Sequence, residues 1–287
     1  MDVRATDITM KSAARAFAER LHAAPDKRLA RFMGEFLTDF ADLADRMNMS
    51  RAELQAAIGF LTEVGEACSE RRQEWVLLAD VLGLTSAFER RHAALPDRAT
   101  PNTLAGPFYR PGAPRRADNE SICLDGKGTP LVFTARLLNN DGQPVPSARI
   151  EVWHANGDGV YENQAPDMQP EFNLRGTYTS GPDGSVRIVT VRPRGYRIPD
   201  DGPVGRLLGQ LGLPTMRPAH LQFRISASGH QTLITHVFDR SDPAIAADPL
   251  FAVDPALLAD FEASDEGGTA CAFTFVLARD EHRSNQT

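Results

Sequence analysis

The sequence is short of cysteine and of long apolar runs, and both shortages narrow the class of protein. Its three cysteines, Cys68, Cys123 and Cys271, are odd in number and far apart. They favour free thiols in a reducing cytoplasm over a secreted disulfide framework. No stretch approaches the roughly 18 to 20 apolar residues of a membrane helix, and the first residues lack a signal-peptide pattern. We therefore expect a cytoplasmic protein with no membrane insertion.

Positive charge is also scarce, since 31 Lys and Arg residues are outnumbered by 38 Asp and Glu residues, a net charge of −7. A nucleic-acid binder needs a basic face to neutralise phosphates, so this balance argues against nucleic acid as a partner. The 42% hydrophobic and 24% charged residues are ordinary for a soluble globular protein. A chain of 287 residues can bury a sizeable core as one large domain or two small ones.

The first hundred residues have the periodicity of amphipathic helices. A capping box at Ser50–Glu53 predicts the start of one helix, and another is expected from about 71 to 82, ended by Gly83. In that last helix we expect three inward side chains: Trp75, Leu78 and Leu82. The longest pattern, with apolar residues every three or four positions, comprises Leu29, Phe32, Met33, Phe36, Leu37, Phe40, Leu43 and Met47.

Beyond Pro101 the pattern changes to short alternating strands separated by glycine- and proline-rich turns, such as 140–142 and 182–184. Such spacing is typical of a β-sandwich. We therefore predict a mainly β protein, with a helical N-terminal domain (1–100), a sandwich domain (101–280) and a frayed tail (281–287). The expected strands are Leu131–Leu138, Arg149–His154, Ser185–Arg192, His220–Ser226, Thr232–Asp239 and Cys271–Leu277.

The candidate functional residues lie in two predicted loops and one predicted strand. Only four tyrosines occur, and two of them, Tyr161 and Tyr196, follow predicted strands in irregular loops, where functional residues concentrate. They could equally cap the core with the ring and expose the hydroxyl. His220 and Gln222 are two apart on a strand and therefore share a face. Two histidines at this spacing would bind one metal ion together, but here the second side chain is the amide of Gln222.

Five further runs have the order and spacing of a known family: 104–109, 150–156, 171–176, 196–205 and 217–220. With them, the sequence resembles the intradiol ring-cleavage dioxygenases of the catechol and hydroxyquinol 1,2-dioxygenase type. The resemblance extends from residue 27 to residue 279 and includes the helical run 72–80.

The resemblance implies a non-haem Fe(III) ion held by two tyrosinates and two histidines. By position, the tyrosinates are Tyr161 and Tyr196, the first histidine is His220, and Gln222 stands where the second histidine belongs. Fe(III) is a hard acid that prefers anionic oxygen, and a bound metal removes the proton of a phenol whose free pKa is about 10. An amide oxygen is also a hard donor, although a weaker one than imidazole.

The resemblance also implies the reaction. Tyr196 takes up a proton from a catechol-type substrate, and O2 is inserted to give a cis,cis-muconate-type product. Arg217 orients the substrate and stabilises developing negative charge, unless it only forms a surface or interface salt bridge. Because Gln222 departs from the family pattern, a non-catalytic or altered-metal protein that binds aromatic ligands stays open as the alternative. An extracellular transthyretin-like carrier is disfavoured by the helical segment.

On the next predicted strand, His236 is a candidate to compensate for the histidine ligand that Gln222 replaces. If the hairpin turn centres on Gly229, Gln222 pairs with His236 and their side chains share a face. Most relatives have a glutamine near the position of His236 and a histidine as the ligand, so the two residue types look exchanged. His236 then either replaces the missing ligand or hydrogen-bonds Gln222. Some hydroxyquinol-type members also have Thr-His at this position, so Thr235-His236 need not be a compensation.

The resemblance implies a substrate pocket and an assembly. An acidic residue at Asp80 suits hydroxyquinol, because its carboxylate can accept a hydrogen bond from the third hydroxyl of that substrate. A solvated position on the helix would explain Asp80 equally well. The helical segment is implied to form a homodimer, sometimes with a bound lipid. By position, the substrate-binding residues are Leu77, Asp80, Leu104, Gly106, Pro107, Phe108 and Phe251.

Overall fold

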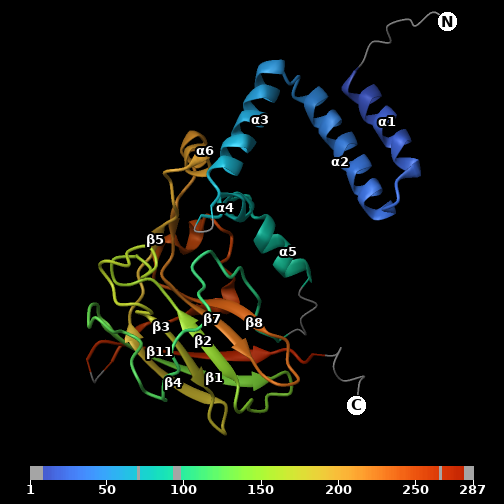
Figure 1. Ribbon diagram of the computed structural model, residues 1–287. Coiled ribbons are helices and arrows are strands. Elements are labelled where there is room, and N and C mark those ends of the chain that lie inside the picture. Colours follow the sequence, from blue (N-terminus) through green and yellow to red (C-terminus); the bar gives the residue numbers. More distant parts are fainter. Residues whose placement is uncertain (1–8, 70–71, 93–97, 265–266, 281–287) are drawn as a thin grey trace, which may run out of the picture. The chain divides into compact units, whose positions relative to one another are not determined.

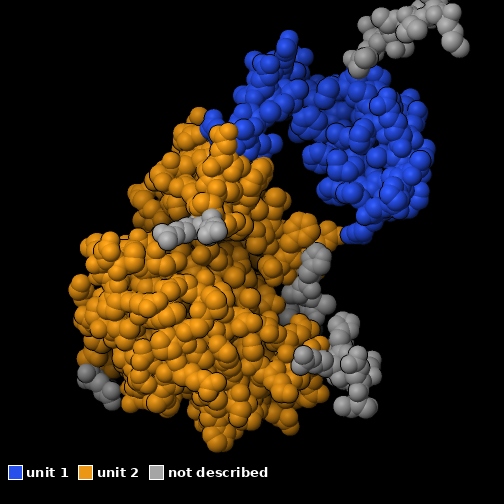
Figure 2. Space-filling view, viewed as in Figure 1, with its two compact units in different colours: residues 1–63 blue, residues 64–287 orange. Residues whose placement is uncertain are grey.

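The computed structural model describes residues 9–69, 72–92, 98–264 and 267–280. They belong to two compact units, residues 1–63 and 64–287, which are coloured separately in Figure 2. The expected tail, residues 281–287, lies outside the described residues. Within the described ranges, no helix is both long and apolar enough to cross a membrane.

The first unit is helical, as expected (Figure 1). The carboxylate of Asp26 accepts a hydrogen bond from the Leu29 N–H and caps α2, which carries the long amphipathic pattern. Ser50 and Glu53 exchange hydrogen bonds and form the predicted capping box of α3. The helices are α1 (Met10–Arg20), the short η1 (Leu21–Ala23), α2 (Lys27–Arg46) and α3 (Arg51–Glu66).

The next helix, α4 (Glu74–Val81), is shorter than expected, and it is followed by α5 (Leu84–His92). Gly83 has a φ of 72° and ends α4 as predicted. Leu78 is buried, but Trp75 and Leu82 are 47% and 56% exposed, so their predicted inward direction is wrong. The buried face is instead centred on Glu74, whose carboxylate accepts hydrogen bonds from Arg72 and from the backbone of Val204.

The rest of the second unit is built around two facing sheets (Figure 1). One sheet has the order β3 (Arg175–Thr179), β2 (Arg149–Trp153), β7 (His220–Ser226), β8 (Leu233–Asp239) and β9 (Leu258–Ala259). The other has the order β10 (Glu262–Ala263), β11 (Thr269–Leu277), β1 (Pro130–Asn139) and β4 (Ser185–Val191). A separate ribbon joins β5 (Tyr196–Arg197) to β6 (Met216–Arg217). The predicted β-sandwich and its six strands are confirmed.

Helices α1 and α5 fall in the segment 1–100 that is expected to be helical, whereas β3, the short strands and the helix α6 (Pro203–Leu211) were not predicted. The 3-10 turns η2 (Pro243–Ala247) and η3 (Pro255–Leu257) were also missed. Strand β3 contains Gly176, whose added Cβ would lie 2.5 Å from Ile122, so close packing there requires a residue that is a poor strand former. Proline at the first position and left-handed Gly212 after the last delimit α6.

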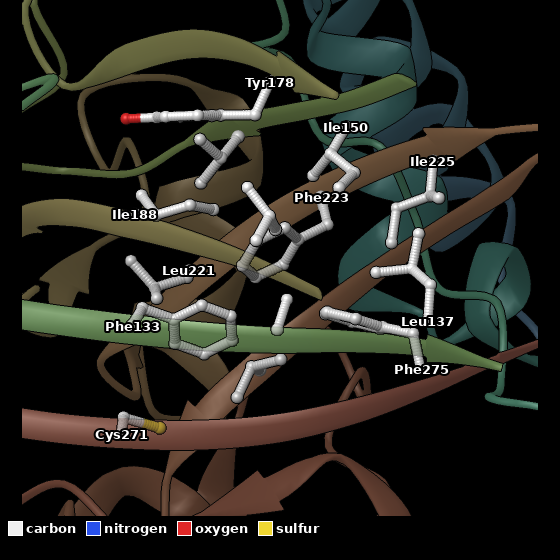
Figure 3. Packing of buried hydrophobic residues seen from close by; sticks show 14 of the residues in the cluster. Phe133, Leu137, Ile150, Tyr178, Ile188, Leu221, Phe223, Ile225, Cys271 and Phe275 are labelled. Atoms are coloured by element: carbon white, nitrogen blue, oxygen red, sulfur yellow. The ribbon is translucent and has the colours of Figure 1, made fainter. Parts of the chain in front are cut away.

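The core lies between the sheets, where aliphatic and aromatic side chains from both interdigitate (Figure 3). Phe223 of β7 packs against Phe133 of β1 and Phe275 of β11, with ring centroids 5.1 and 5.0 Å apart. Leu221 and Ile225 lie on the same face of β7 as Phe223. Successive strand residues point to opposite faces, so the other face of this sheet is left for the neighbouring polar residues.

Candidate metal centre

The four candidate metal ligands come together on the face of β7 that is turned away from the sandwich core. His220 and Gln222 project from β7 itself, Tyr161 lies in the loop after β2, and Tyr196 begins β5. All four side chains are buried. Their convergence agrees with the grouping that the sequence resemblance implies.

The rings of this group form a contiguous aromatic cluster. Tyr161 and Tyr196 meet edge to face with centroids 5.5 Å apart, and Tyr196 lies 5.7 Å from His220. His220 in turn lies 4.7 Å from His236, while Phe108 stacks on Tyr161 at 4.3 Å. Donor atoms from residues as far apart in the sequence as Tyr161 and Gln222 are thereby concentrated in one small buried volume.

Three donor atoms in this volume have no hydrogen-bond partner among the described residues: Tyr161 Oη, His220 Nε2 and Gln222 Oε1. Buried polar atoms are rarely left unsatisfied, and each requires an explanation. The fourth candidate donor atom, Tyr196 Oη, accepts a hydrogen bond of 3.3 Å from Arg217. A cation bound by phenol oxygen, imidazole nitrogen and amide oxygen would satisfy the three unpartnered atoms at once. The residues present therefore fit a hard metal ion such as Fe(III).

Among the described residues, no group of three or more His, Cys, Asp and Glu side chains is placed to hold a metal. The candidate centre thus depends on phenol and amide oxygens, which such a grouping does not include.

A buried ion-pair network positions Tyr161 through its neighbour. Glu162 accepts hydrogen bonds of 2.6 Å from both Arg175 and Arg110, and Arg175 also donates to the carbonyl of Phe108 at 2.6 Å. The Arg175 guanidinium lies 5.8 Å from the centroid of the Tyr161 ring. Removing either partner of a buried pair leaves an uncompensated charge, so this network holds the loop in a single arrangement.

Gly159 allows the two tyrosine loops to approach each other. It has a φ of 80°, and a Cβ there would lie 2.8 Å from the Gly195 carbonyl and 3.0 Å from the Tyr196 side chain. Only glycine adopts this conformation without strain while leaving that space open. Any larger residue would push Tyr196 away from Tyr161.

Hydrogen bonding gives His220 the tautomer that a metal ligand needs. Nδ1 lies 2.7 Å from the Pro218 carbonyl oxygen, which can only accept, so Nδ1 carries the proton. Nε2 therefore presents its lone pair to the centre. Burial, and then the charge of Arg217, lowers the pKa of His220, which keeps the imidazole neutral.

The phenol of Tyr161 is stable in its neutral form unless a cation is present. Burial raises its pKa well above the ordinary value, the adjacent Tyr196 raises it further, and Arg217 opposes both effects. A metal at Oη reverses this balance because its charge stabilises the phenolate.

Arg217 is held as a buried cation beside Tyr196. Its Nε donates to Asp248 at 3.1 Å, and Nη1 donates to Tyr196 Oη. Burial lowers the pKa of Arg217, but Asp248 and Tyr196 more than offset this, so the net pKa lies above the ordinary value. The salt bridge to Asp248 is buried, so Arg217 does not form the surface pair that was the alternative to a role at the centre.

A cavity of about 350 Å³ opens beside Tyr196. Four residues expected to bind substrate line it, namely Leu77, Asp80, Pro107 and Phe108. Asp80 is fully buried rather than solvated, and its Oδ1 has no hydrogen-bond partner within the described ranges. Burial raises the pKa of Asp80, although the hydroxyl of Thr85 and the charge of Arg217 lower it.

The other three expected pocket residues do not line this cavity. Leu104 is buried, and Gly106 lies against the amide of Gln222, since a Cβ there would be 3.4 Å from Nε2. Phe251 is 55% exposed and packs beside Gly83. These residues therefore stay predictions as substrate contacts.

Comparison with known proteins decides the family. Residues 26–100 match the family model described as catechol dioxygenase N terminus, and residues 104–279 match the model described as dioxygenase. The chain is 41% identical to a hydroxyquinol 1,2-dioxygenase of Rhizobium sp. (strain MTP-10005), covering 90% of this chain and 87% of that one.

The chain belongs to the intradiol ring-cleavage dioxygenases.

Further relatives agree with this assignment. A 6-chlorohydroxyquinol 1,2-dioxygenase of Cupriavidus pinatubonensis is 37% identical, over 92% of this chain and 95% of that one. The crystal structure of hydroxyquinol 1,2-dioxygenase from Pseudomonas putida DLL-E4 superposes with a TM-score of 0.90 at 32% identity, covering 94% of this chain and 99% of that one. The protein is thus an enzyme that cleaves catechol-type rings with O2, and its family implies non-haem iron. The non-catalytic alternative finds no support in these comparisons.

Within this dioxygenase, sequence reasoning missed two residues of the centre, Asp248 and Thr103. Asp248 pairs with Arg217, and Thr103 Oγ1 lies 2.5 Å from His236 Nδ1. Neither residue stands near its partner in the sequence, so no local signal was available. His154 is buried with both ring nitrogens hydrogen-bonded, to Ala155 and Thr190, so its role is structural.

Proposed function

We propose that this intradiol dioxygenase holds a ferric ion with Tyr161, Tyr196, His220 and Gln222 and that hydroxyquinol is its preferred substrate. The observation that carries the metal assignment is the set of three buried, unpartnered donor atoms at one place. When bound there, Fe(III) would act as the Lewis acid that makes a catechol-type diol reactive toward O2.

Tyr196 is the group best placed to take a proton from the substrate. It lines the cavity, and its oxygen lies within hydrogen-bond distance of Arg217. A phenolate formed at Tyr196 Oη is stabilised by that guanidinium and can accept the proton of a substrate hydroxyl. Arg217 then remains as a fixed positive charge beside the ring on which negative charge develops.

Asp248 keeps Arg217 in place. Besides its two contacts with the guanidinium, it accepts hydrogen bonds from the backbone of Leu250 and Ala252. A charge held by such a pre-formed network needs no reorganisation during the reaction, which is the condition for effective electrostatic stabilisation.

Asp80 supports the choice of hydroxyquinol. Its Oδ1 is buried and unpartnered in the described part of the chain, and it borders the same cavity as Tyr196. The third hydroxyl of hydroxyquinol would donate to this oxygen, whereas plain catechol leaves it unsatisfied. Oxygen uptake on hydroxyquinol, catechol and substituted catechols tests the assignment. Hydroxyquinol should have the highest kcat/KM, and a clear preference for catechol would contradict the role of Asp80.

We further infer that the enzyme is a cytoplasmic homodimer that associates through its N-terminal helices and binds a lipid there. Large apolar side chains exposed on those helices support this assembly, since such surfaces mark interaction sites. They include Leu29, Phe32, Phe36, Leu43, Met47, Ile58 and Leu61. Light scattering would give the mass of the assembly, and extraction followed by mass spectrometry would identify a lipid.

A further inference from the structure

Gln222 and His236 are direct partners across the β7–β8 hairpin. The register pairs them as the sequence predicted, and Gln222 Nε2 lies 2.7 Å from His236 Nε2. On the other side of the imidazole, Nδ1 lies 2.5 Å from Thr103 Oγ1. Both nitrogens of His236 are therefore engaged, and neither has a lone pair free for a metal.

The chemistry of the amide fixes the direction of these hydrogen bonds. An amide nitrogen only donates, so His236 Nε2 accepts from Gln222 and the ring proton resides on Nδ1. Nδ1 then donates to the hydroxyl oxygen of Thr103. In this arrangement the other end of the Gln222 amide, Oε1, is the end without a partner among the described residues.

Thr103 is itself firmly positioned. Its backbone N–H donates to the carbonyl of Ile234 at 2.8 Å, and Asn102 accepts from the N–H of Ile234 at 3.0 Å. Thr235 donates its hydroxyl to the Pro101 carbonyl at 2.8 Å. The segment before the pocket is thus fastened to β8 through Pro101, Asn102 and the backbone of Thr103, and it presents the Thr103 hydroxyl to His236.

We propose that Thr103 and His236 are positioning residues that orient the Gln222 amide with its oxygen toward the metal centre. The inference rests on the proposed function, because it concerns the fourth ligand of that centre. The opposite amide orientation would direct two N–H groups at a cation and remove the ligand. His236 is accordingly the residue that makes an amide usable where the family has a histidine, and it is not a ligand itself.

Iron retention tests this inference without reliance on turnover. Wild-type protein and the variants His236→Leu, Thr103→Val and Gln222→Leu would be loaded with ferric iron. Iron per chain, the rate of iron loss to a chelator and the position of the tyrosinate-to-iron absorption band would then be measured. His220→Leu serves as the reference for loss of a true ligand, and circular dichroism checks that each variant is folded.

We expect His236→Leu and Thr103→Val to lose iron about 10- to 100-fold faster than wild type, the range for outer partners of metal ligands. Their absorption bands should shift in the same direction as that of Gln222→Leu. Thr103→Ser keeps the hydroxyl and should restore wild-type behaviour. Thr177→Val removes a buried hydroxyl on β3 that donates to the Ala113 carbonyl at 3.1 Å, and as a matched control it should retain iron normally.

Two results would overturn the inference. If His236→Leu loses iron as completely as His220→Leu while Gln222→Leu keeps it, His236 is the ligand. If His236→Leu and Thr103→Val match wild type in both iron loss and band position, the pair does not orient the amide. Failure of the wild type to take up ferric iron would instead refute the proposed function, which separates the two failures.

Discussion

Leu221, Phe223 and Ile225 fill the core on one face of β7, whereas His220 and Gln222, equally buried, present unpartnered polar atoms on the other. On the first face, stability comes from removing apolar surface from water, so any side chain of the right size and polarity contributes. On the second face, burial costs stability until a ligand satisfies the polar atoms. The same strand therefore serves folding on one side and chemistry on the other.

The largest expected effect belongs to the core face. Phe223→Ala should lower the free energy of unfolding by about 3–5 kcal/mol, because it leaves a cavity between Phe133 and Phe275. Urea unfolding of iron-free protein measures the loss. Met168→Ala, at a side chain that is 77% exposed, should change stability by less than about 0.5 kcal/mol. Equal losses in the two variants would remove the distinction between the core face and an ordinary surface.

On the chemical face, Arg217→Gln should lower kcat by about 10²–10³-fold, the usual effect of removing one group that stabilises developing charge. Iron content should stay near that of wild type, since the guanidinium contacts Tyr196 without occupying a ligand position. Stopped-flow kinetics and metal analysis give both values. A variant with normal kcat, or one that loses its iron, would show that Arg217 acts differently.

The stability of the fold near the candidate centre also depends on a buried histidine, His154, that is neutral in the folded protein. Burial lowers the pKa of His154 to about 4, although its bond to Ala155 raises it, against an unfolded value of 6.5. As pH falls, His154 is therefore protonated in the unfolded state before it is protonated in the folded state. The contribution of neutral His154 to the free energy of unfolding is complete above pH 6.5 and is lost as pH falls toward 4. The expected slope is at most about 1.4 kcal/mol per pH unit.

Urea titrations of iron-free wild type and His154→Gln at pH 7 and pH 5 measure this contribution. The variant should lose less stability between the two pH values than wild type does. Parallel losses would assign the acid sensitivity to other groups.

The smallest expected effect separates substrates. Asp80→Ala should reduce kcat/KM for hydroxyquinol relative to catechol by a factor that corresponds to about 1–3 kcal/mol, the value of one buried hydrogen-bond partner. Steady-state oxygen uptake on both substrates gives the ratio. Identical losses on the two would make Asp80 a structural residue of the cavity.

The difference between the two faces of β7 also explains which features of the protein could be predicted from the sequence. Alternation along β7 identified the strand and its core face, and turn chemistry around Gly229 gave the correct register between Gln222 and His236. Both predictions depend only on residues that lie close together in the sequence. Thr103 and Asp248 went unnoticed because their partners are more than 30 residues away, and only the closed fold brings them together. Trp75 was misplaced because the buried positions of α4 include the carboxylates Glu74 and Asp80, which apolar periodicity does not predict.

We propose above all that the outer face of β7 binds ferric iron through phenolate, imidazole and amide donors. The most direct test is the iron content and visible spectrum of the wild-type protein beside Tyr161→Phe. We predict one iron per wild-type chain and a red to burgundy colour from tyrosinate-to-iron charge transfer. The variant, while still folded, should lose iron and the band together. A colourless wild type that stays iron-free after ferric reconstitution, or a Tyr161→Phe variant with unchanged iron and spectrum, would contradict the claim.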